Sequence, residues 1–294
     1  MIDFEVWPGP MEGIGKGGFV NAVNHLELVD RWMTPFFRLS QELPRRSKMA
    51  SFISVFQPDK IPVCVQLMGV DPVLLGEAAV CFAELGATEI NLNFGCPSSR
   101  VVSGGAGGGA LKSPDKLADF CRIVRKQLPQ QLPLSVKLRS GWEKSEEMEF
   151  LLPSLTESGA VSKIFFHYRT VREQYLPIDE SERMRRFQRA VELLEQIPLV
   201  LNGDIADVPS GIEIVERFKC AGIMIARPWL RDPWLLRRFK HRDCPDAESG
   251  REIFFAEAAA CDVPQGGMIE LAKMLWGVND PHFKKVLGGR EQPT

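Results

Sequence analysis

Polar side chains stand at the ends of several short apolar runs in this chain. Cys96 closes one run, Lys137 and Arg139 close the next, and His167 lies near the end of a third. A thiol close to a substrate can donate a proton, and the three basic side chains supply positive charge and hydrogen bonds for an anionic ligand. These runs and the others also hold Glu12, Gln66, Asn91, Asn93, Arg169, Asn202, Asp204 and Arg227 at or near their ends. Polar groups in apolar strands are costly unless partnered, so their recurrence predicts one shared site.

Two amide side chains and two late loops suggest which ligand this site takes. Gln66 and Asn93 offer the donor and acceptor pairs that suit a flat heterocycle with an imide edge. The residue pairs 203–204 and 226–227 follow the last two apolar runs. Barrel enzymes often bind phosphate in the loops after these strands. The residues themselves therefore predict a site for an anionic, flat cofactor.

Eight apolar runs alternate with longer amphipathic segments, and this pattern predicts the fold. The runs cover residues 4–10, 32–39, 61–69, 89–96, 132–139, 163–169, 197–204 and 222–227. Helices are predicted over 71–86, 113–128, 143–159, 182–195 and 208–220, with Ser113 as an N-cap. Pro35 weakens the second strand. Repeated β–α alternation predicts an α/β fold, a (β/α)8 TIM barrel. A doubly wound sheet is the alternative.

The βα pattern breaks in a charged stretch near residues 238–248. We expect a catalytic barrel over residues 1–243 and a small helical C-terminal domain over 244–294, which adds a short helical appendage to the barrel. This domain shows helical patterns at 251–261 and 267–277, and the last seven residues are expected to fray.

The charge of the chain is nearly balanced, with 36 Lys plus Arg against 38 Asp plus Glu. Any RNA contact therefore needs a local basic face. The chain also has two basic segments, each of which can be either a solvated helix face or an RNA contact. One contains Arg183, Arg185, Arg186 and Arg189, and the other contains Arg237, Arg238, Lys240 and Arg242.

The seven cysteines are irregularly spaced without a CxxC pair, so we expect neither a disulfide framework nor a metal site. Reduced cysteines fit the cytoplasm. The N-terminus does not have the pattern of a signal peptide, and no apolar stretch has the length of a membrane span. We therefore expect a cytoplasmic protein that does not insert into a membrane.

Several motifs, in order over residues 8–240, resemble the tRNA-dihydrouridine synthase family. They are GPMEG at 9–13, VQLMG at 65–69, NLNFGCPS at 91–98, SGGAGGGALKSP at 103–114, SVKLRSGW at 135–142, HYRT at 167–170, NGDI at 202–205 and GIMIARPWLRDPWL at 222–235. The segment 98–112 is most similar to the C-type bacterial branch, which acts on uridine 16.

The resemblance implies FMN at the barrel mouth, NADPH as its reductant and a single flipped uridine of tRNA as the substrate. In this reaction, reduced flavin passes hydride to C6 of the uracil, and a cysteine, here Cys96, protonates C5. The resemblance assigns substrate binding to Asn93, Lys137, Arg139 and His167. It assigns cofactor binding to Pro10, Met11, Gln66, Lys137, His167, Asn202, Gly203, Asp204, Ala226 and Arg227. It implies no protein partner.

The chain departs from the family in three places. Tyr168 and Ala226 stand where the family usually has glycine, and a missing glycine can block close approach of the backbone to a ligand. The C-terminal domain is shorter than usual, with Lys273 and Trp276 as a remnant. The glycine-rich run 104–109 beside Cys96 predicts a lid that orders on substrate binding. Alternative functions are an FMN barrel enzyme for a free small molecule, a dihydrouridine synthase for ribosomal RNA, and a non-catalytic RNA-binding descendant.

Overall fold

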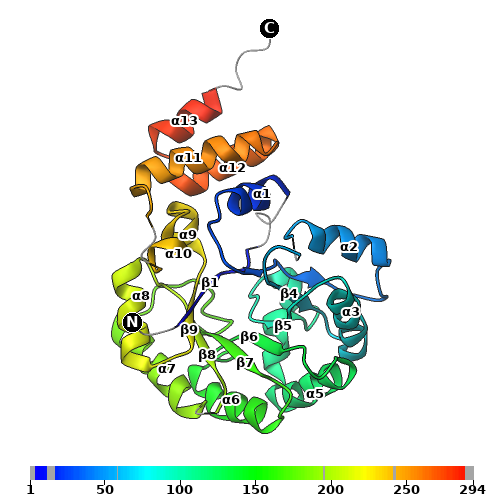
Figure 1. The fold of residues 1–294 in the computed structure, drawn as a ribbon. Coiled ribbons are helices and arrows are strands. Elements are labelled where there is room, and N and C mark those ends of the chain that lie inside the picture. Colours follow the sequence, from blue (N-terminus) through cyan, green and yellow to red (C-terminus); the bar gives the residue numbers. More distant parts are fainter. Residues whose placement is uncertain (1–3, 12–16, 58, 195, 241–242, 289–294) are drawn as a thin grey trace.

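A curled sheet of parallel strands forms the centre of the molecule, and helices surround it (Figure 1). The computed structural model describes residues 4–11, 17–57, 59–194, 196–240 and 243–288. The strands are β1 (Glu5–Pro8), β2 (Trp32–Met33), β3 (Phe37–Arg38), β4 (Val63–Met68), β5 (Glu89–Phe94), β6 (Leu134–Arg139), β7 (Lys163–His167), β8 (Leu199–Asn202) and β9 (Gly222–Ile225). Their hydrogen-bonded order is β1-β9-β8-β7-β6-β5-β4-β2, and β3 also pairs with β4. The predicted TIM barrel is confirmed.

The predicted second strand is split at Pro35. Its halves β2 and β3 both pair in parallel with β4, through Trp32 opposite Val63 and Phe37 opposite Leu67. Proline has no backbone N–H to donate to the ladder, so the pairing is interrupted between the two halves.

Five helices cover the outside of the barrel after β4 to β8: α3 (Pro72–Glu84), α5 (Leu117–Gln127), α6 (Met148–Glu157), α7 (Glu180–Leu193) and α8 (Val208–Phe218). Asp71 caps α3, because its carboxylate accepts hydrogen bonds from the backbone N–H groups of Val73 and Leu74. Ser113 was predicted to cap the next helix, but it precedes the 3-10 turn η2 (Pro114–Lys116) and its side chain makes no capping bond.

Several further helical segments were not predicted. Short ones lie in loops: α4 (Ser99–Val102), η1 (Gly107–Lys112), η3 (Ser145–Glu147), α9 (Arg227–Arg231) and α10 (Leu235–Arg238). Two longer helices, α1 (Gly17–His25) and α2 (Arg46–Ser54), flank the split second strand. Their apolar faces are short, which leaves a weak helical pattern in the sequence.

Three C-terminal helices lie together at the side of the barrel where α1 is found (Figure 1). Two had been predicted, α11 (Ala247–Ala260) and α12 (Gln265–Trp276), and the third, α13 (Pro281–Gly288), had not. The ring of Phe254 in α11 packs edge-on against Phe19 in α1, with the centroids 5.4 Å apart. A domain boundary at residue 243 stays a prediction, and residues 289–294 of the tail expected to fray lie outside the described residues.

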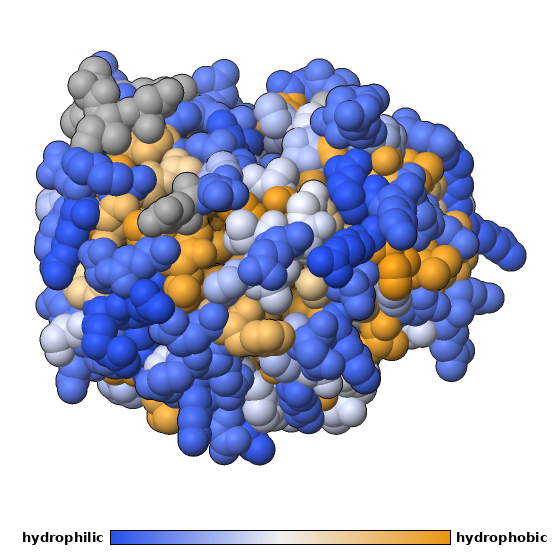
Figure 2. Space-filling model, turned by 90° about the horizontal axis from the view of Figure 1, so that it is seen from below, coloured by the Kyte–Doolittle hydropathy of each residue, from blue (hydrophilic) through white to orange (hydrophobic). Residues whose placement is uncertain are grey.

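The barrel interior is packed with side chains. One buried cluster inside the sheet consists of Trp7, Met33, Cys64, Phe165, Val200 and Met224. Such a layer makes the barrel a solid support for loops at one end rather than a pore. Figure 2, the view from below Figure 1, shows mainly hydrophilic side chains with hydrophobic patches between them. Among the described residues, no helix is long and apolar enough to cross a membrane.

Candidate active site

A cavity of about 1240 Å³ opens at the carboxyl ends of the strands. Its lining includes every residue that the family resemblance assigns to catalysis, substrate or cofactor: Pro10, Met11, Gln66, Asn93, Cys96, Lys137, Arg139, His167, Asn202, Gly203, Asp204, Ala226 and Arg227. Asn91 and Arg169, which were also expected at the site, do not line the cavity. Ligand pockets commonly measure about 300–1,000 Å³, so this cavity is large. The fold therefore gathers residues that are far apart in the chain around one space. Glu12 lies outside the described residues.

The C-terminal helices add a wall that the sequence did not predict. Ala247 and Arg251 of α11 and Met274 of α12 line the cavity, together with Arg231 of α9. No motif marks Ala247, Arg251 or Met274, because their position depends on how the C-terminal helices fold back over the barrel mouth.

Linked amide side chains form the floor of the cavity beside Cys96. Asn93 Nδ2 donates to Gln66 Oε1 at 2.8 Å, and Gln66 Nε2 donates to Asn91 Oδ1 at 2.8 Å. Asn93 Oδ1 accepts from the backbone N–H groups of Gly95 and Cys96, at 3.1 and 3.0 Å. Because each amide is held by its neighbours, the network fixes both Asn93 and the backbone that carries the thiol.

The glycine-rich run packs against Cys96 rather than projecting from it. The N–H of Gly108 donates to the Cys96 carbonyl at 2.9 Å, and residues 107–109 are buried in η1. A Cβ on Gly108 would lie only 2.7 Å from a methyl carbon of Val171 and 2.9 Å from the Cys96 carbonyl oxygen. These glycines therefore allow close packing against Cys96, and a lid that orders on substrate binding stays a prediction.

Lys137 and His167 bring basic groups into the cavity under strong desolvation. Lys137 Nζ donates to Asn202 Oδ1 at 3.0 Å, and Asn202 Nδ2 donates in turn to the Met224 carbonyl at 2.9 Å. Burial, assisted by the charge of Arg139, lowers the pKa of Lys137 to about 7. Burial and the charges of Arg139 and Lys137 hold the pKa of His167 well below its ordinary value. At neutral pH His167 is therefore uncharged, and Lys137 can gain or lose a proton.

Arg139 ties two loops of the cavity together. Its Nε donates to the Gly95 carbonyl at 2.8 Å, and its Nη1 donates to the carbonyls of Thr170 and Gln174 at 2.9 and 2.8 Å. The side chain is buried, and this burial lowers its pKa to about 10. Arg139 therefore remains charged at neutral pH and joins the loop after β5 to the loop after β7.

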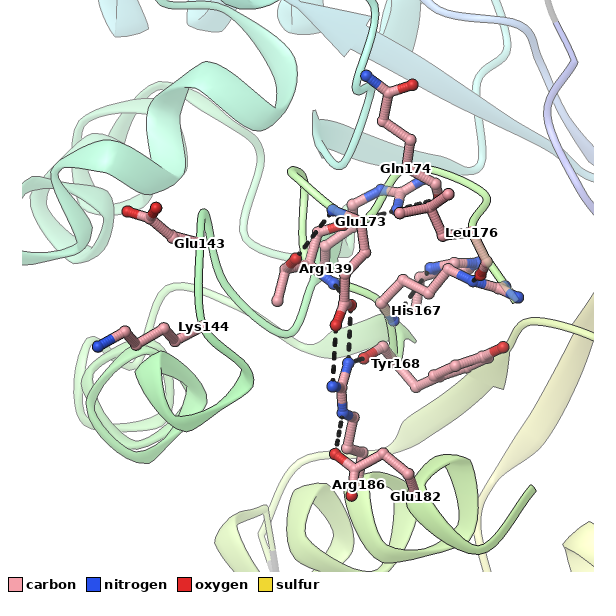
Figure 3. Close-up of polar contacts among 12 residues, drawn as sticks. Arg139, Glu143, Lys144, His167, Tyr168, Glu173, Gln174, Leu176, Glu182 and Arg186 are labelled. Atoms are coloured by element: carbon pink, nitrogen blue, oxygen red, sulfur yellow. Dashed lines mark hydrogen bonds and ion pairs between the residues drawn. The ribbon is translucent and has the colours of Figure 1, made fainter. Parts of the chain in front are cut away.

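Helix α7 anchors the loop after β7 from outside the barrel (Figure 3). Arg186 pairs with both carboxylate oxygens of Glu173, at 2.8 and 2.9 Å, and donates to the Tyr168 carbonyl at 3.1 Å. Glu173 in turn accepts from the N–H of Thr170 at 2.7 Å. A second carboxylate, that of Glu182, lies 2.6 Å from Arg186 Nε. This chain of contacts fixes the loop whose carbonyls accept from Arg139.

The same loop places Tyr175 at the cavity mouth. Tyr175 lines the cavity, yet its side chain is largely exposed. The guanidinium carbons of Arg139 and Arg227 lie 5.5 and 5.2 Å from its ring centroid, within range of cation–π attraction. The sequence analysis did not select this tyrosine.

Asp204 is the centre of a charged cluster at the end of β8. Its carboxylate accepts from the Tyr168 hydroxyl and from Arg169 Nη2, each at 2.5 Å, and pairs with Arg227 Nη2 at 3.2 Å. Burial alone would raise the pKa of Asp204, but the bonds from Arg169 and Tyr168 outweigh it and hold the pKa below the ordinary value. Asp204 is therefore ionised, and its ion pair with Arg227 holds the Arg227 guanidinium at the cavity.

Tyr168 and Ala226, the two residues that stand where the family usually has glycine, do not fill the cavity. Tyr168 is fully buried against Phe187 of α7, with centroids 5.5 Å apart, and is not among the residues that line the cavity. Ala226 does line it, and its methyl group is accommodated by Gly9, where a Cβ would lie 2.6 Å from the Ala226 Cβ.

The two basic segments are engaged in protein contacts. On α7, Arg183 pairs with Glu180, Arg185 with Glu182, and Arg189 with Glu149 and Glu192, in addition to the contacts of Arg186. In the second segment, Arg237 donates to the Leu26 carbonyl, Arg238 pairs with Asp232, and Lys240 with Asp30. Arg242 lies outside the described residues. This pairing favours structural roles for both segments over RNA contact.

The two residues taken as a remnant of a longer C-terminal domain lie on α12. Trp276 stacks on His282 of α13, with ring centroids 5.1 Å apart. Lys273 is exposed and lies 4.0 Å from Glu270. Trp276 therefore packs within the helical appendage, whereas Met274 of the same helix reaches the cavity.

Comparisons with known proteins agree with this geometry. The sequence model of the dihydrouridine synthase (Dus) family matches residues 9–266. The tRNA-dihydrouridine(16) synthase of Pseudomonas syringae pv. tomato is 31% identical over 249 residues, which cover 83% of this chain and 75% of that protein. A probable tRNA-dihydrouridine synthase of Rickettsia bellii is 30% identical over 207 residues, covering 68% of this chain and 62% of the relative.

A solved structure shares the fold at low sequence identity. A mutant of morphinone reductase in complex with tetrahydroNAD superposes with a TM-score of 0.54 and 10% identity, covering 80% of this chain and 86% of that one. At this identity the likeness concerns the barrel alone.

Proposed function

Because this chain belongs to the dihydrouridine synthase family, we propose that it reduces a uridine of tRNA to 5,6-dihydrouridine. The observation that carries the proposal is the gathering of Cys96, Lys137 and His167 around one large cavity at the barrel mouth. Relatives named tRNA-dihydrouridine(16) synthase support position 16 as the target.

The chemistry of the cavity lining fits FMN. Asn93 can direct an amide hydrogen at the polar edge of a flat ring, and Gln66 holds Asn93 in place by accepting a hydrogen bond from its amide group. Lys137 and Arg227 supply positive charge for an anionic cofactor, and the uncharged His167 supplies a ring N–H donor. Asn202 and Gly203 provide polar side-chain and backbone groups nearby. Pro10, Met11, Asp204 and Ala226 complete the proposed cofactor contacts. When bound, FMN reduced by NADPH supplies the hydride that C6 of the uracil requires.

Cys96 is the proposed general acid for C5. Its backbone N–H is held by Asn93, and its carbonyl by Gly108, so the thiol is positioned on a fixed turn. Cys96 and Lys137 interact electrostatically, and this interaction favours the charged ammonium. The same attraction stabilises the thiolate that remains after Cys96 has given up its proton.

The size of the cavity suits two flat groups, a flavin ring and the uracil of the substrate, rather than one. The double bond of a stacked uracil is poorly accessible in folded RNA, so the base must be flipped into the site. We propose that Asn93, Lys137, Arg139 and His167 receive it. Arg139 is a charged group that three backbone carbonyls already hold in place, so little side-chain entropy is lost when it binds the base.

A modification map of RNA tests the proposal. Mass spectrometry of tRNA from a deletion strain should show loss of dihydrouridine at one position, restored by the wild-type gene. Unchanged tRNA would contradict the proposed substrate, and loss in ribosomal RNA alone would support the ribosomal alternative. The purified protein should be yellow. A colourless protein that cannot take up FMN would instead support a non-catalytic descendant.

A further inference from the structure

Three side chains with metal-binding atoms meet outside the cavity lining described above. They are His25 at the end of α1, Glu257 in α11 and Cys261 directly after α11. His25 Nδ1 lies 2.9 Å from Glu257 Oε1, and Cys261 Sγ lies 3.6 Å from both of these atoms. No motif marks this cluster, because His25 is more than 230 positions from the other two residues in the chain.

The spacing of these atoms is close to that of three corners of a zinc tetrahedron. With Zn–S near 2.3 Å and Zn–N and Zn–O near 2.0 Å, tetrahedral angles place sulfur about 3.5 Å from both nitrogen and oxygen. The observed separations of 3.6 Å are close to this value. The nitrogen–oxygen edge, at 2.9 Å, would have to open to about 3.3 Å, which a rotation of the Glu257 side chain can supply.

The backbone fixes this arrangement from two sides. Glu257 and Cys261 are four residues apart, so they lie on one face of the helix. Helix α1 approaches that face closely, since a Cβ on Gly18 would lie 2.8 Å from the Cys261 carbonyl oxygen. The packing of Phe19 on Phe254 holds the two helices together one turn away. Metal ligands on such a rigid interface lose little freedom on binding.

We propose that His25, Glu257 and Cys261 bind a divalent ion of the zinc class, which pins α1 to α11. A thiolate, a carboxylate and a neutral imidazole together carry two negative charges, which balance the ion, and they are the ligand types that zinc prefers. The His25 side chain is 59% exposed and that of Glu257 30% exposed, so solvent can reach the fourth position and a water can occupy it. The proposal is independent of the flavin chemistry.

Cobalt provides a direct test on the full-length, chelator-treated protein. One equivalent of Co²⁺ should give a thiolate-to-cobalt charge-transfer band, which Zn²⁺ then abolishes by displacement. The band should disappear in Cys261→Ser. His25→Asn should weaken the affinity by more than the roughly 10–100-fold that follows loss of an outer-shell partner of a metal ligand. Cys81→Ser is the matched control, because Cys81 is also a half-buried thiol but lies outside the cluster, and it should keep the band.

Thermal unfolding gives a second readout. Added Zn²⁺ should raise the Tm of the wild type and of Cys81→Ser in a concentration-dependent way, and should leave that of His25→Asn unchanged. His25 is an exposed residue at a helix end, so this variant should fold. Absence of a stoichiometric thiolate band, or a band that persists in Cys261→Ser, would overturn the proposal and leave the cluster as a hydrogen-bonded ion pair.

Discussion

The hydroxyl of Tyr168 donates a 2.5 Å hydrogen bond to the carboxylate of Asp204, and the tyrosine ring lies against Gly203. A Cβ on Gly203 would come within 2.6 Å of the ring, and the φ of Gly203 is +121°. Glycine at position 203 therefore leaves room for Tyr168, which does not line the cavity but helps to fix Asp204 and its partner Arg227.

Tyr168→Phe should lower the free energy of unfolding by about 1.5–3 kcal/mol, because it removes a hydrogen bond to an ionised group while it keeps the ring packing. Urea unfolding measures the change. Tyr175→Phe is the matched control, since Tyr175 is exposed and should change stability by less than about 0.5 kcal/mol. Equal losses in the two variants would show that the bond to Asp204 contributes nothing.

Cys96→Ala should reduce the rate of dihydrouridine formation by about 10²–10⁴-fold, the usual contribution of a positioned general acid. Flavin binding, followed by absorbance, should persist because the amide network through Asn93 uses the backbone of residue 96. Cys81→Ala should retain full activity, since Cys81 does not line the cavity. A fully active Cys96→Ala enzyme would exclude the thiol as the proton donor.

Lys137 should make the stability of the flavin-free protein depend on pH. Its pKa is about 7 in the fold and near 10.5 in an unfolded chain, so between these values the unfolded state binds more protons. The contribution of Lys137 to the free energy of unfolding therefore rises with pH in this window, by at most about 1.4 kcal/mol per pH unit, and is constant below it.

Comparison of urea unfolding from pH 6 to about 10 tests this sign. The difference between the wild type and Lys137→Met should grow in favour of the wild type as the pH rises. Lys144→Met, at an exposed position, should give a curve parallel to that of the wild type. A parallel curve for Lys137→Met as well would mean that Lys137 titrates normally.

The rim of the barrel could be predicted from the sequence because it is built from local patterns. A polar residue at the end of an apolar run, as with Lys137 or Asn202, is visible in the run itself, and parallel strands place all such ends together. The break at Pro35 follows equally from one residue. Contacts between distant segments carry no such signal: Arg186 holds Glu173, and Met274 reaches the cavity, only through the packing of whole helices.

Arg186 and Arg189 lie one turn apart on α7 and cannot be told apart from the sequence, where both belong to one basic segment. In the fold, the Arg186 side chain is 9% exposed and pairs with Glu173, whereas that of Arg189 is 41% exposed and pairs with Glu149. Arg186→Gln should lower the free energy of unfolding by about 3 kcal/mol, since it leaves a partly buried carboxylate without its partner. Arg189→Gln should cost much less, because exposed ion pairs are screened by solvent.

Enzyme activity should also be lower in Arg186→Gln than in Arg189→Gln. Arg186→Gln releases Glu173 and with it the loop whose carbonyls hold Arg139, so kcat/KM should fall even at temperatures where the variant is fully folded. Arg189→Gln should have wild-type kcat/KM and RNA affinity, since its guanidinium is engaged by Glu149 and Glu192. A salt-dependent loss of RNA affinity in Arg189→Gln would instead restore this face of α7 as an RNA contact.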